Sequence, residues 1–239
     1  MNLADAYLKT ARAKEHLDSL REELEIYYES KPCKFKEQTD IRNQRYRIRI
    51  HIVDPPDRLS LIAGDVFGCL RASLDHLVWA LSSFNTTAYA ENTQFPILEE
   101  PNAPRFKRQT NNVPAGAVAI IDSLQPYSRG KDRKAFEGHL LWRLNRLCNI
   151  DKHRRIPLHG SVVDFKLPAS IPQSMVVCDS DTMSLPLQMK DAVRLHRDAT
   201  FKVTFGDSHE GIECDQDGIE RIYAFVAGDV IPRFAKFFK

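Results

Sequence analysis

The sequence predicts an α+β protein in which an N-terminal bundle of about four helices is followed by a small antiparallel sheet and a C-terminal helix. Apolar residues recur at helical spacing over long stretches of residues 1–156. After Pro157 the chain changes to short β-like runs separated by proline, aspartate and glycine, and from about Asp217 the helical period returns. We therefore expect a helical domain over 1–156 and a β-rich region with the C-terminal helix over 157–239.

The first helix is expected from residue 3 to about 29, where Lys31-Pro32 ends the pattern. Its expected apolar stripe consists of Leu3, Tyr7, Ala11, Leu17, Leu20, Leu24 and Tyr27. The period then changes to two. Tyr46, Ile48, Ile50 and Ile52 alternate with Arg45, Arg47, Arg49 and His51. This alternation predicts a half-buried strand whose basic outer face either follows a nucleic-acid backbone or is simply solvated.

A second helix is expected from Asp57 to about Leu81, with a continuous leucine-rich stripe and with Gly64 and Gly68 allowing close approach of a neighbouring helix. The segment 82–112 has little periodicity and predicts a long loop that could act as a lid. Two more helices are expected, over 114–123 and from Asp132 to Asn149. The later β-like runs are Ser161 to Leu167, Ser174 to Cys178, Met183 to Gln188 and Ala199 to Phe205.

Composition narrows the class of protein without naming a ligand. A chain of 239 residues with 43% hydrophobic residues can bury a full core, and its net charge of +2 neither demands nor excludes a nucleic-acid partner. The five cysteines are scattered and include no CxxC pair, which predicts free thiols in a reducing cytoplasm. No signal peptide and no apolar run long enough to span a membrane is recognisable, and nothing indicates specificity for DNA.

The most informative stretch is 65–81, DVFGCLRASLDHLVWAL, which places Arg71, Asp75 and His76 on an otherwise apolar helix. Arg71 and Asp75 are four residues apart and share a face. In a structural interpretation they form an ion pair at the rim of the core, and His76 bonds a backbone carbonyl. In a catalytic interpretation His76 is the proton acceptor of a metal-independent ribonuclease, and Arg71 stabilises the charge that builds on phosphorus.

A second cluster, Asp151-Lys152-His153-Arg154, follows a later apolar helix, with Arg146 one turn back. Its cations can simply cap the helix, since they meet the negative end of the helix dipole. Alternatively, Lys152, Arg154 and Arg146 hold phosphate, Asp151 or Asn149 positions His153, and His76 or His153 acts as base and acid. We expect this turn and the Arg71/His76 helix to face one groove. No metal site is expected, because HExxH and Glu-x-x-His pairs are absent.

The segment Arg71-Ala-Ser-Leu-Asp-His76 resembles the Arg-x(4 to 6)-His motif of HEPN-type helical domains. The order LRASLDHLVW, FPI at 95–97, LQPY at 124–127 and NIDKHR at 149–154 is similar to that of an uncharacterised bacterial family, over roughly residues 1–160. Ala72 departs from the HEPN pattern, which often has a polar residue after the arginine.

Many HEPN proteins are RNA-cleaving toxins, antiviral factors or stress proteins that work as dimers. The resemblance therefore implies a homodimer that binds or cuts RNA with no cofactor. The alternative is a non-catalytic dimeric module that binds a nucleotide or a protein, in which Arg71, Asp75 and His153 belong to a structural network.

Overall fold

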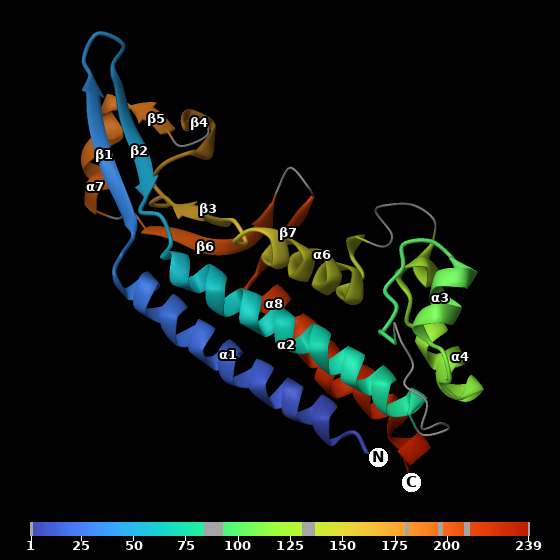
Figure 1. The fold of residues 1–239 in the computed structure, drawn as a ribbon. Helices are drawn as coiled ribbons and strands as arrows, with labels where there is room; N and C mark the ends of the chain where they lie inside the picture. The colour runs from blue at the N-terminus through green and yellow to red at the C-terminus, as the bar shows by residue number, and fades with distance from the viewer. Residues whose placement is uncertain are drawn as a thin grey trace. The chain divides into compact units, whose positions relative to one another are not determined.

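The computed structural model describes residues 2–83, 93–130, 137–179, 182–195, 198–207 and 211–238, and has an α+β fold (Figure 1). Its helical elements are α1 (Ala4–Glu29), α2 (Asp57–Ser82), α3 (Ala103–Gln109), α4 (Ala115–Ser123), η1 (Pro126–Arg129), α6 (Leu140–His153), η2 (Gln173–Met175), η3 (Leu187–Met189), α7 (Lys190–Leu195), α8 (Gln216–Ala224), the π-helical η4 (Phe225–Val230) and η5 (Ile231–Phe238). Its strands are β1 (Cys33–Asp40), β2 (Arg45–Ile52), β3 (Leu158–Lys166), β4 (Val177–Asp179), β5 (Thr182–Pro186), β6 (Asp198–Asp207) and β7 (Ile212–Asp215).

The chain forms two compact units, and each unit combines segments that are distant in the sequence. Unit 1 consists of Met1–Glu22, Asp57–Pro157 and Phe205–Lys239, and unit 2 consists of Glu23–Pro56 and Leu158–Thr204. The sequence predicted two contiguous domains instead. The C-terminal helix belongs to the helical unit because its apolar residues Ile219 and Ile222 are fully buried and α8 packs against α6.

The buried stripe of α1 differs from the predicted one. Its buried members are Leu3, Ala6, Thr10, Ala13, Leu17, Leu20, Leu24 and Tyr27, which alternate in steps of three and four. Tyr7 is 42% exposed and Ala11 is also exposed, so these two assignments were wrong. Small residues at 6 and 13 let a neighbouring helix approach closely. In unit 1, α1 runs alongside α2 (Figure 1), and His16 Nδ1 lies 3.9 Å from Asp65 Oδ2.

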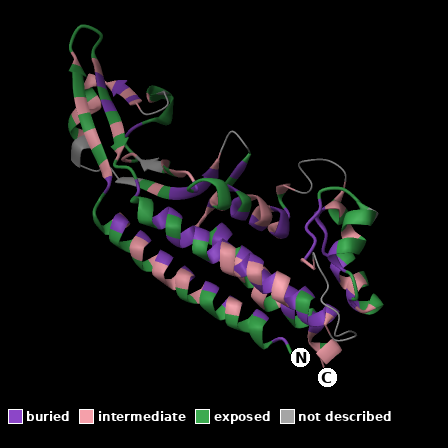
Figure 2. Ribbon diagram, in the orientation of Figure 1, coloured by how far each residue is buried: buried purple, intermediate pink, exposed green. Residues whose placement is uncertain are grey.

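Helix α2 is buried along most of its length (Figure 2) and packs against α6. Gly64 makes the close approach possible, because a Cβ added there would lie 2.6 Å from the Asp151 carboxyl carbon. Gly68 has nothing within 4 Å of such a Cβ, so only the first of the two glycines has the predicted role. One turn earlier on α2, the Ser60 hydroxyl donates to the Ile156 carbonyl at 2.7 Å and holds the same end of the contact.

The connection after α2 contains a helix that the sequence did not predict. The Asn102 side chain accepts a hydrogen bond from Arg105 N and caps α3, whose first turn also contains Pro104. Residues 84–92 of the expected loop lie outside the described residues. So does Asp132, the expected start of the following helix. Helix α6 is described from Leu140, and it ends at His153 rather than at Asn149.

The strands form two antiparallel sheets with orders β1-β2-β5-β4 and β3-β6-β7. In the first sheet β1 and β2 form a hairpin, and β2 also pairs with β5. The inner face of β2 supplies Tyr46 and Ile48 to a core that includes Met183 and Leu185. The predicted alternation of β2 is therefore confirmed, since Arg47, Arg49 and His51 are exposed on its other face.

Candidate functional site

The Arg71 side chain belongs to an internal clamp formed by Arg71, Asp75 and the backbone of Phe95. The guanidinium Nη2 donates to Asp75 Oδ1 at 3.0 Å and to the Phe95 carbonyl at 2.7 Å. The same carboxylate oxygen accepts from the Phe95 N–H at 3.0 Å. The four-residue spacing on α2 aims both side chains at one point, so the clamp satisfies both backbone groups of Phe95. The ion pair that the structural interpretation expects between Arg71 and Asp75 is therefore present.

The arginine of the clamp is buried in the interior of the protein. Arg71 is 6% exposed, and its Nη1 has no hydrogen-bond partner among the residues that the structure describes. Burial lowers the pKa of the Arg71 guanidinium, although the charge of Asp75 opposes this change. Burial also raises the pKa of the Asp75 carboxyl against the opposing effect of Arg71. Each ion is therefore held in place at a cost in solvation that its partner only partly offsets.

A second polar residue holds the same extended segment from the other side. Gln125 is fully buried, and its amide donates to the Pro96 carbonyl at 2.8 Å and to the Ile121 carbonyl at 3.0 Å. Its side-chain oxygen accepts from Leu98 N at 3.0 Å. Residues 95–98 thus lie in the interior outside any described strand, and side chains of α2 and Gln125 bond both backbone groups of Phe95, the Pro96 carbonyl and the Leu98 N–H. Sequence reasoning identified these segments only as motifs and assigned Gln125 no role.

Besides Arg71, two predicted site residues, His76 and Lys152, act by their charge on Asp75 of the clamp. His76 is half-buried on α2, and Lys152 is exposed at the end of α6. Both are close enough to Asp75 for their charges to lower its pKa, although burial dominates. Cys148 of α6 is also close to Arg71, whose charge opposes the rise that burial causes in the thiol pKa. The packing of α2 on α6 therefore brings part of the two predicted clusters together.

The rest of the second cluster is divided among different contacts. Asp151 packs on Gly64, and burial there raises its pKa. His153 is exposed. Arg154 pairs with Asp207 at 2.9 Å, and the next residue, Arg155, pairs with Asp57. These ion pairs give two arginines of this turn carboxylate partners in other segments of the chain.

Arg146 is the remaining residue of that cluster. Its guanidinium carbon lies 6.0 Å from the ring centroid of Trp142, a distance typical of a cation–π contact. Trp142 in turn donates from Nε1 to Glu99 at 2.8 Å. The Trp142 ring, one helical turn earlier on α6, therefore contacts the Arg146 side chain.

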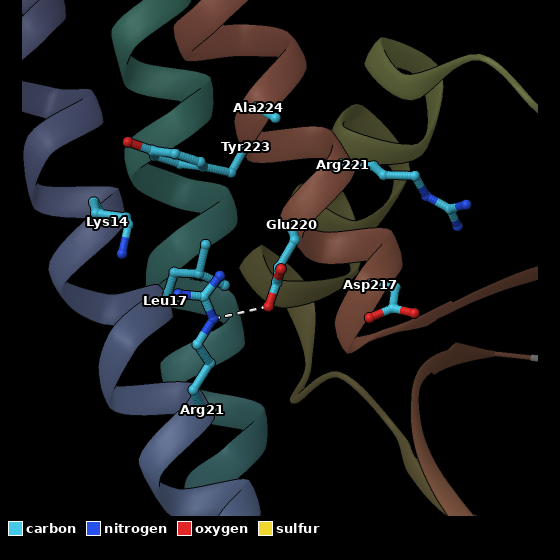
Figure 3. Close-up of a pocket in the computed structure, with 8 residues that line it drawn as sticks. All are labelled: Lys14, Leu17, Arg21, Asp217, Glu220, Arg221, Tyr223 and Ala224. Carbon is cyan, nitrogen blue, oxygen red and sulfur yellow. Dashed lines mark hydrogen bonds and ion pairs between the residues drawn. The ribbon is translucent and has the colours of Figure 1, made fainter.

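A surface pocket of about 390 Å³ lies elsewhere in unit 1 (Figure 3). It is lined by Lys14, Leu17, Arg21, Asp217, Glu220, Arg221, Tyr223 and Ala224. The Arg21 Nε donates to Glu220 at 2.8 Å, which raises the pKa of Arg21 and lowers that of Glu220. The charges that line the pocket are mixed, and none of the sequence-predicted site residues contributes to it.

Within the described part of the chain, no group of three or more His, Cys, Asp or Glu side chains is arranged to hold a metal ion. A search of the same residues finds no helix whose length and hydropathy would let it cross a bilayer. All five cysteines are free thiols. Comparison of the chain with protein-family models, with curated proteins and with solved structures found no match.

Proposed function

We propose that this protein binds RNA without cutting it, and that His76 and Lys152 contact an RNA phosphate at the surface beside Asp75. The observation that carries the proposal is that the charges of both side chains, one from α2 and one from α6, act on the same carboxyl group, that of Asp75. The exposed ammonium of Lys152 and the partly exposed imidazole of His76 can each offer N–H donors to an anionic oxygen. The buried charge of Arg71 lies behind Asp75 in the same clamp.

Cleavage is disfavoured by the position of Arg71. A ribonuclease needs a cation that reaches the phosphorane, and a proton acceptor near the ribose 2′-hydroxyl. The Arg71 guanidinium is instead enclosed, and its Nη2 is already shared between Asp75 and Phe95. His153 is exposed, and Arg154 is paired with Asp207. The catalytic set of Arg71, His76 and His153 is therefore the less favoured alternative.

The resemblance to HEPN domains extends the proposal. We propose that the helices of the 1–156 region, with α2 and α6 at their centre, form a HEPN-like bundle, and that the protein is a homodimer in a reducing cytoplasm. The free state of all five cysteines is compatible with that compartment. Size-exclusion chromatography with light scattering tests the dimer directly, and a monomeric mass would contradict it.

A single set of variants tests binding against cleavage. Labelled single-stranded RNA is incubated in EDTA with the wild type, Arg71→Ala, His76→Ala and Lys152→Ala, and both binding and cleavage are followed. Lys107→Ala is the matched control, since Lys107 is an exposed lysine on α3. We expect no cleavage by any form, and weaker binding by His76→Ala and Lys152→Ala at unchanged melting temperature. Arg71→Ala should melt several degrees lower, since it unpairs the clamp.

The outcomes separate the alternatives. Metal-independent cleavage by the wild type that is lost in both Arg71→Ala and His76→Ala would establish the ribonuclease and overturn the proposal. Absence of RNA binding by the wild type would leave the alternative of a module that binds a nucleotide or a protein. Equal binding by Lys152→Ala, Lys107→Ala and the wild type would show that RNA is held elsewhere on the surface.

A further inference from the structure

We infer that the outer face of the β1–β2 hairpin binds the phosphate backbone of nucleic acid, as a second contact surface that lies in unit 2. This inference rests on the proposed RNA binding but not on the residues assigned to it. We call this surface the basic face. It consists of Lys34, Lys36, Arg45, Arg47, Arg49 and His51.

The strand register places cations directly opposite one another. Lys36 faces Arg49 across the two strands, and Lys34 faces His51. Side chains in such pairs lie on the same face of the sheet, and like charges directly opposite destabilise the pairing. Lys34 and Lys36 form no ion pair with any other residue that the structure describes. The two lysines of β1 therefore keep unpaired positive charges on this face of the described hairpin.

Protection of a sheet edge does not explain this arrangement. Exposed edge strands often carry lysine, which prevents pairing with other chains. This explanation fits Lys34 and Lys36, because β1 is at an edge of the sheet. It does not fit Arg47 and Arg49, because β2 lies between β1 and β5 and has no free edge.

The negative charge on this side of the hairpin is confined to one end. Asp40 faces Arg45, lies 3.4 Å from Arg47, and accepts two hydrogen bonds from Asn43 next to the turn. These contacts lower the pKa of Asp40, with the Asn43 hydrogen bond as the main cause. At the other end, with Lys34, Lys36, Arg49 and His51, neither β1 nor β2 places a carboxylate on this face, because Glu37 of β1 belongs to the opposite face. Across β5, Asp179 of β4 occupies the same register row as Lys36 and Arg49. A polyanion would still meet more cations than carboxylates at this end.

The chemistry of the basic face selects backbone recognition over base recognition. Proteins that read single-stranded bases stack them on aromatic side chains. The aromatic residues of the hairpin, Phe35 and Tyr46, lie on the opposite face and pack in the core of unit 2. The expected ligand is therefore the sugar-phosphate backbone without regard to sequence, and RNA and DNA should bind with similar affinity.

The test measures binding to a fluorescent single-stranded RNA and to the DNA of the same sequence over a series of salt concentrations. The full-length variant Lys36→Gln/Arg49→Gln removes one cross-strand cation pair. Lys107→Gln/Arg108→Gln removes the same charge from exposed positions on α3, and Lys152→Gln tests the proposed site on α6. Loss of two backbone contacts should reduce the slope of log K against log salt by about 1.4 and weaken binding about 25-fold near 0.1 M salt. The α3 control should bind like the wild type.

Each outcome supports or overturns the inference. Weakening by Lys36→Gln/Arg49→Gln alone, at a melting temperature no lower than that of the wild type, supports it even if Lys152→Gln has no effect. Weakening by Lys152→Gln alone overturns it and leaves the proposed function intact. A wild type that binds neither RNA nor DNA overturns both. A final measurement uses vesicles that contain phosphatidylserine. If Lys36→Gln/Arg49→Gln loses binding to the vesicles and keeps binding to RNA, the basic face contacts a membrane surface instead, and the inference is overturned.

Discussion

The clamp around Phe95 allows a quantitative test of the claim that Arg71 and Asp75 are structural. Asp75→Asn keeps an oxygen that can accept from the Phe95 N–H, but it removes the charge opposite a guanidinium that is 6% exposed. Removal of one partner from a buried ion pair typically lowers the free energy of unfolding by about 3–5 kcal/mol. We expect a smaller loss of about 2–3 kcal/mol for Asp75→Asn, because the Asp75 side chain is 33% exposed and the amide keeps its hydrogen bond.

The decisive comparison is a double-mutant cycle. Arg71→Met alone leaves the Phe95 carbonyl without its donor and the buried part of Asp75 without its counter-charge, at a cost of about 2 kcal/mol. In Arg71→Met/Asp75→Asn no unpaired buried charge remains, and the lost hydrogen bond should dominate at about 1–2 kcal/mol. The double variant should therefore be no less stable than either single variant. The coupling between the two sites should be about 2 kcal/mol or more in magnitude.

Urea unfolding followed by tryptophan fluorescence measures these changes in the free energy of unfolding in unit 1, which contains the clamp. The chain has two tryptophans, and both lie in unit 1: Trp79 is on α2 and Trp142 is on α6. Glu100→Gln, at an exposed carboxylate, is the control for loss of a negative charge, and its free energy of unfolding should stay within about 0.5 kcal/mol of the wild type. Additive effects of the two clamp substitutions would refute the reasoning.

Two further predictions concern buried polar groups of unit 1. His139 is buried at the start of α6, where its Nδ1 accepts from Leu141 N, and burial lowers its pKa to about 4 from 6.5. Between these pKa values the unfolded state binds more protons than the folded state, so the free energy of unfolding falls by roughly 3 kcal/mol as the pH drops from about 6.5 to 4. His139→Asn keeps a capping oxygen but cannot titrate, so its free energy of unfolding should depend less on pH over this range. A pH profile parallel to that of the wild type would contradict the prediction. Gln125→Ala leaves the Pro96 carbonyl and the Leu98 N–H without partners, so it should cost about 2–4 kcal/mol and speed hydrogen exchange at Leu98; unchanged protection of that amide would show that Gln125 does not hold the segment.

The elements with a single clear period were predictable from the sequence. The alternation from Arg45 to Ile52 identified β2 and the correct buried face, because one side of the strand packs in a core and the other does not. Strand β1 was missed, since Phe35 is its only large apolar residue and its pairing is imposed by the hairpin. The stripe of α1 was misplaced at Tyr7 because a tyrosine ring can bury more area than the small Ala6, whereas close helix packing favours the alanine.

Within the candidate site, the sequence predicted contacts between residues of one helix but not contacts between that helix and distant segments. Spacing on α2 predicted that Arg71 and Asp75 share a face, and they form an ion pair. It could not identify Phe95 as their common partner, because that contact joins a helix to an extended segment twenty residues later. Gln125 gave a weak signal, since a glutamine between leucine and proline in an apolar context needs buried partners.

The two-sided character of β2 also affects how the hairpin can form. If β2 slipped by one residue against its partners, the face now occupied by Tyr46 and Ile48 would present arginines to the core, and the isoleucines would face water. Each misaligned pairing would bury several charges at once. Incorrect alignments are therefore energetically unfavourable, and the arginines of the outer face help to fix the register of the sheet.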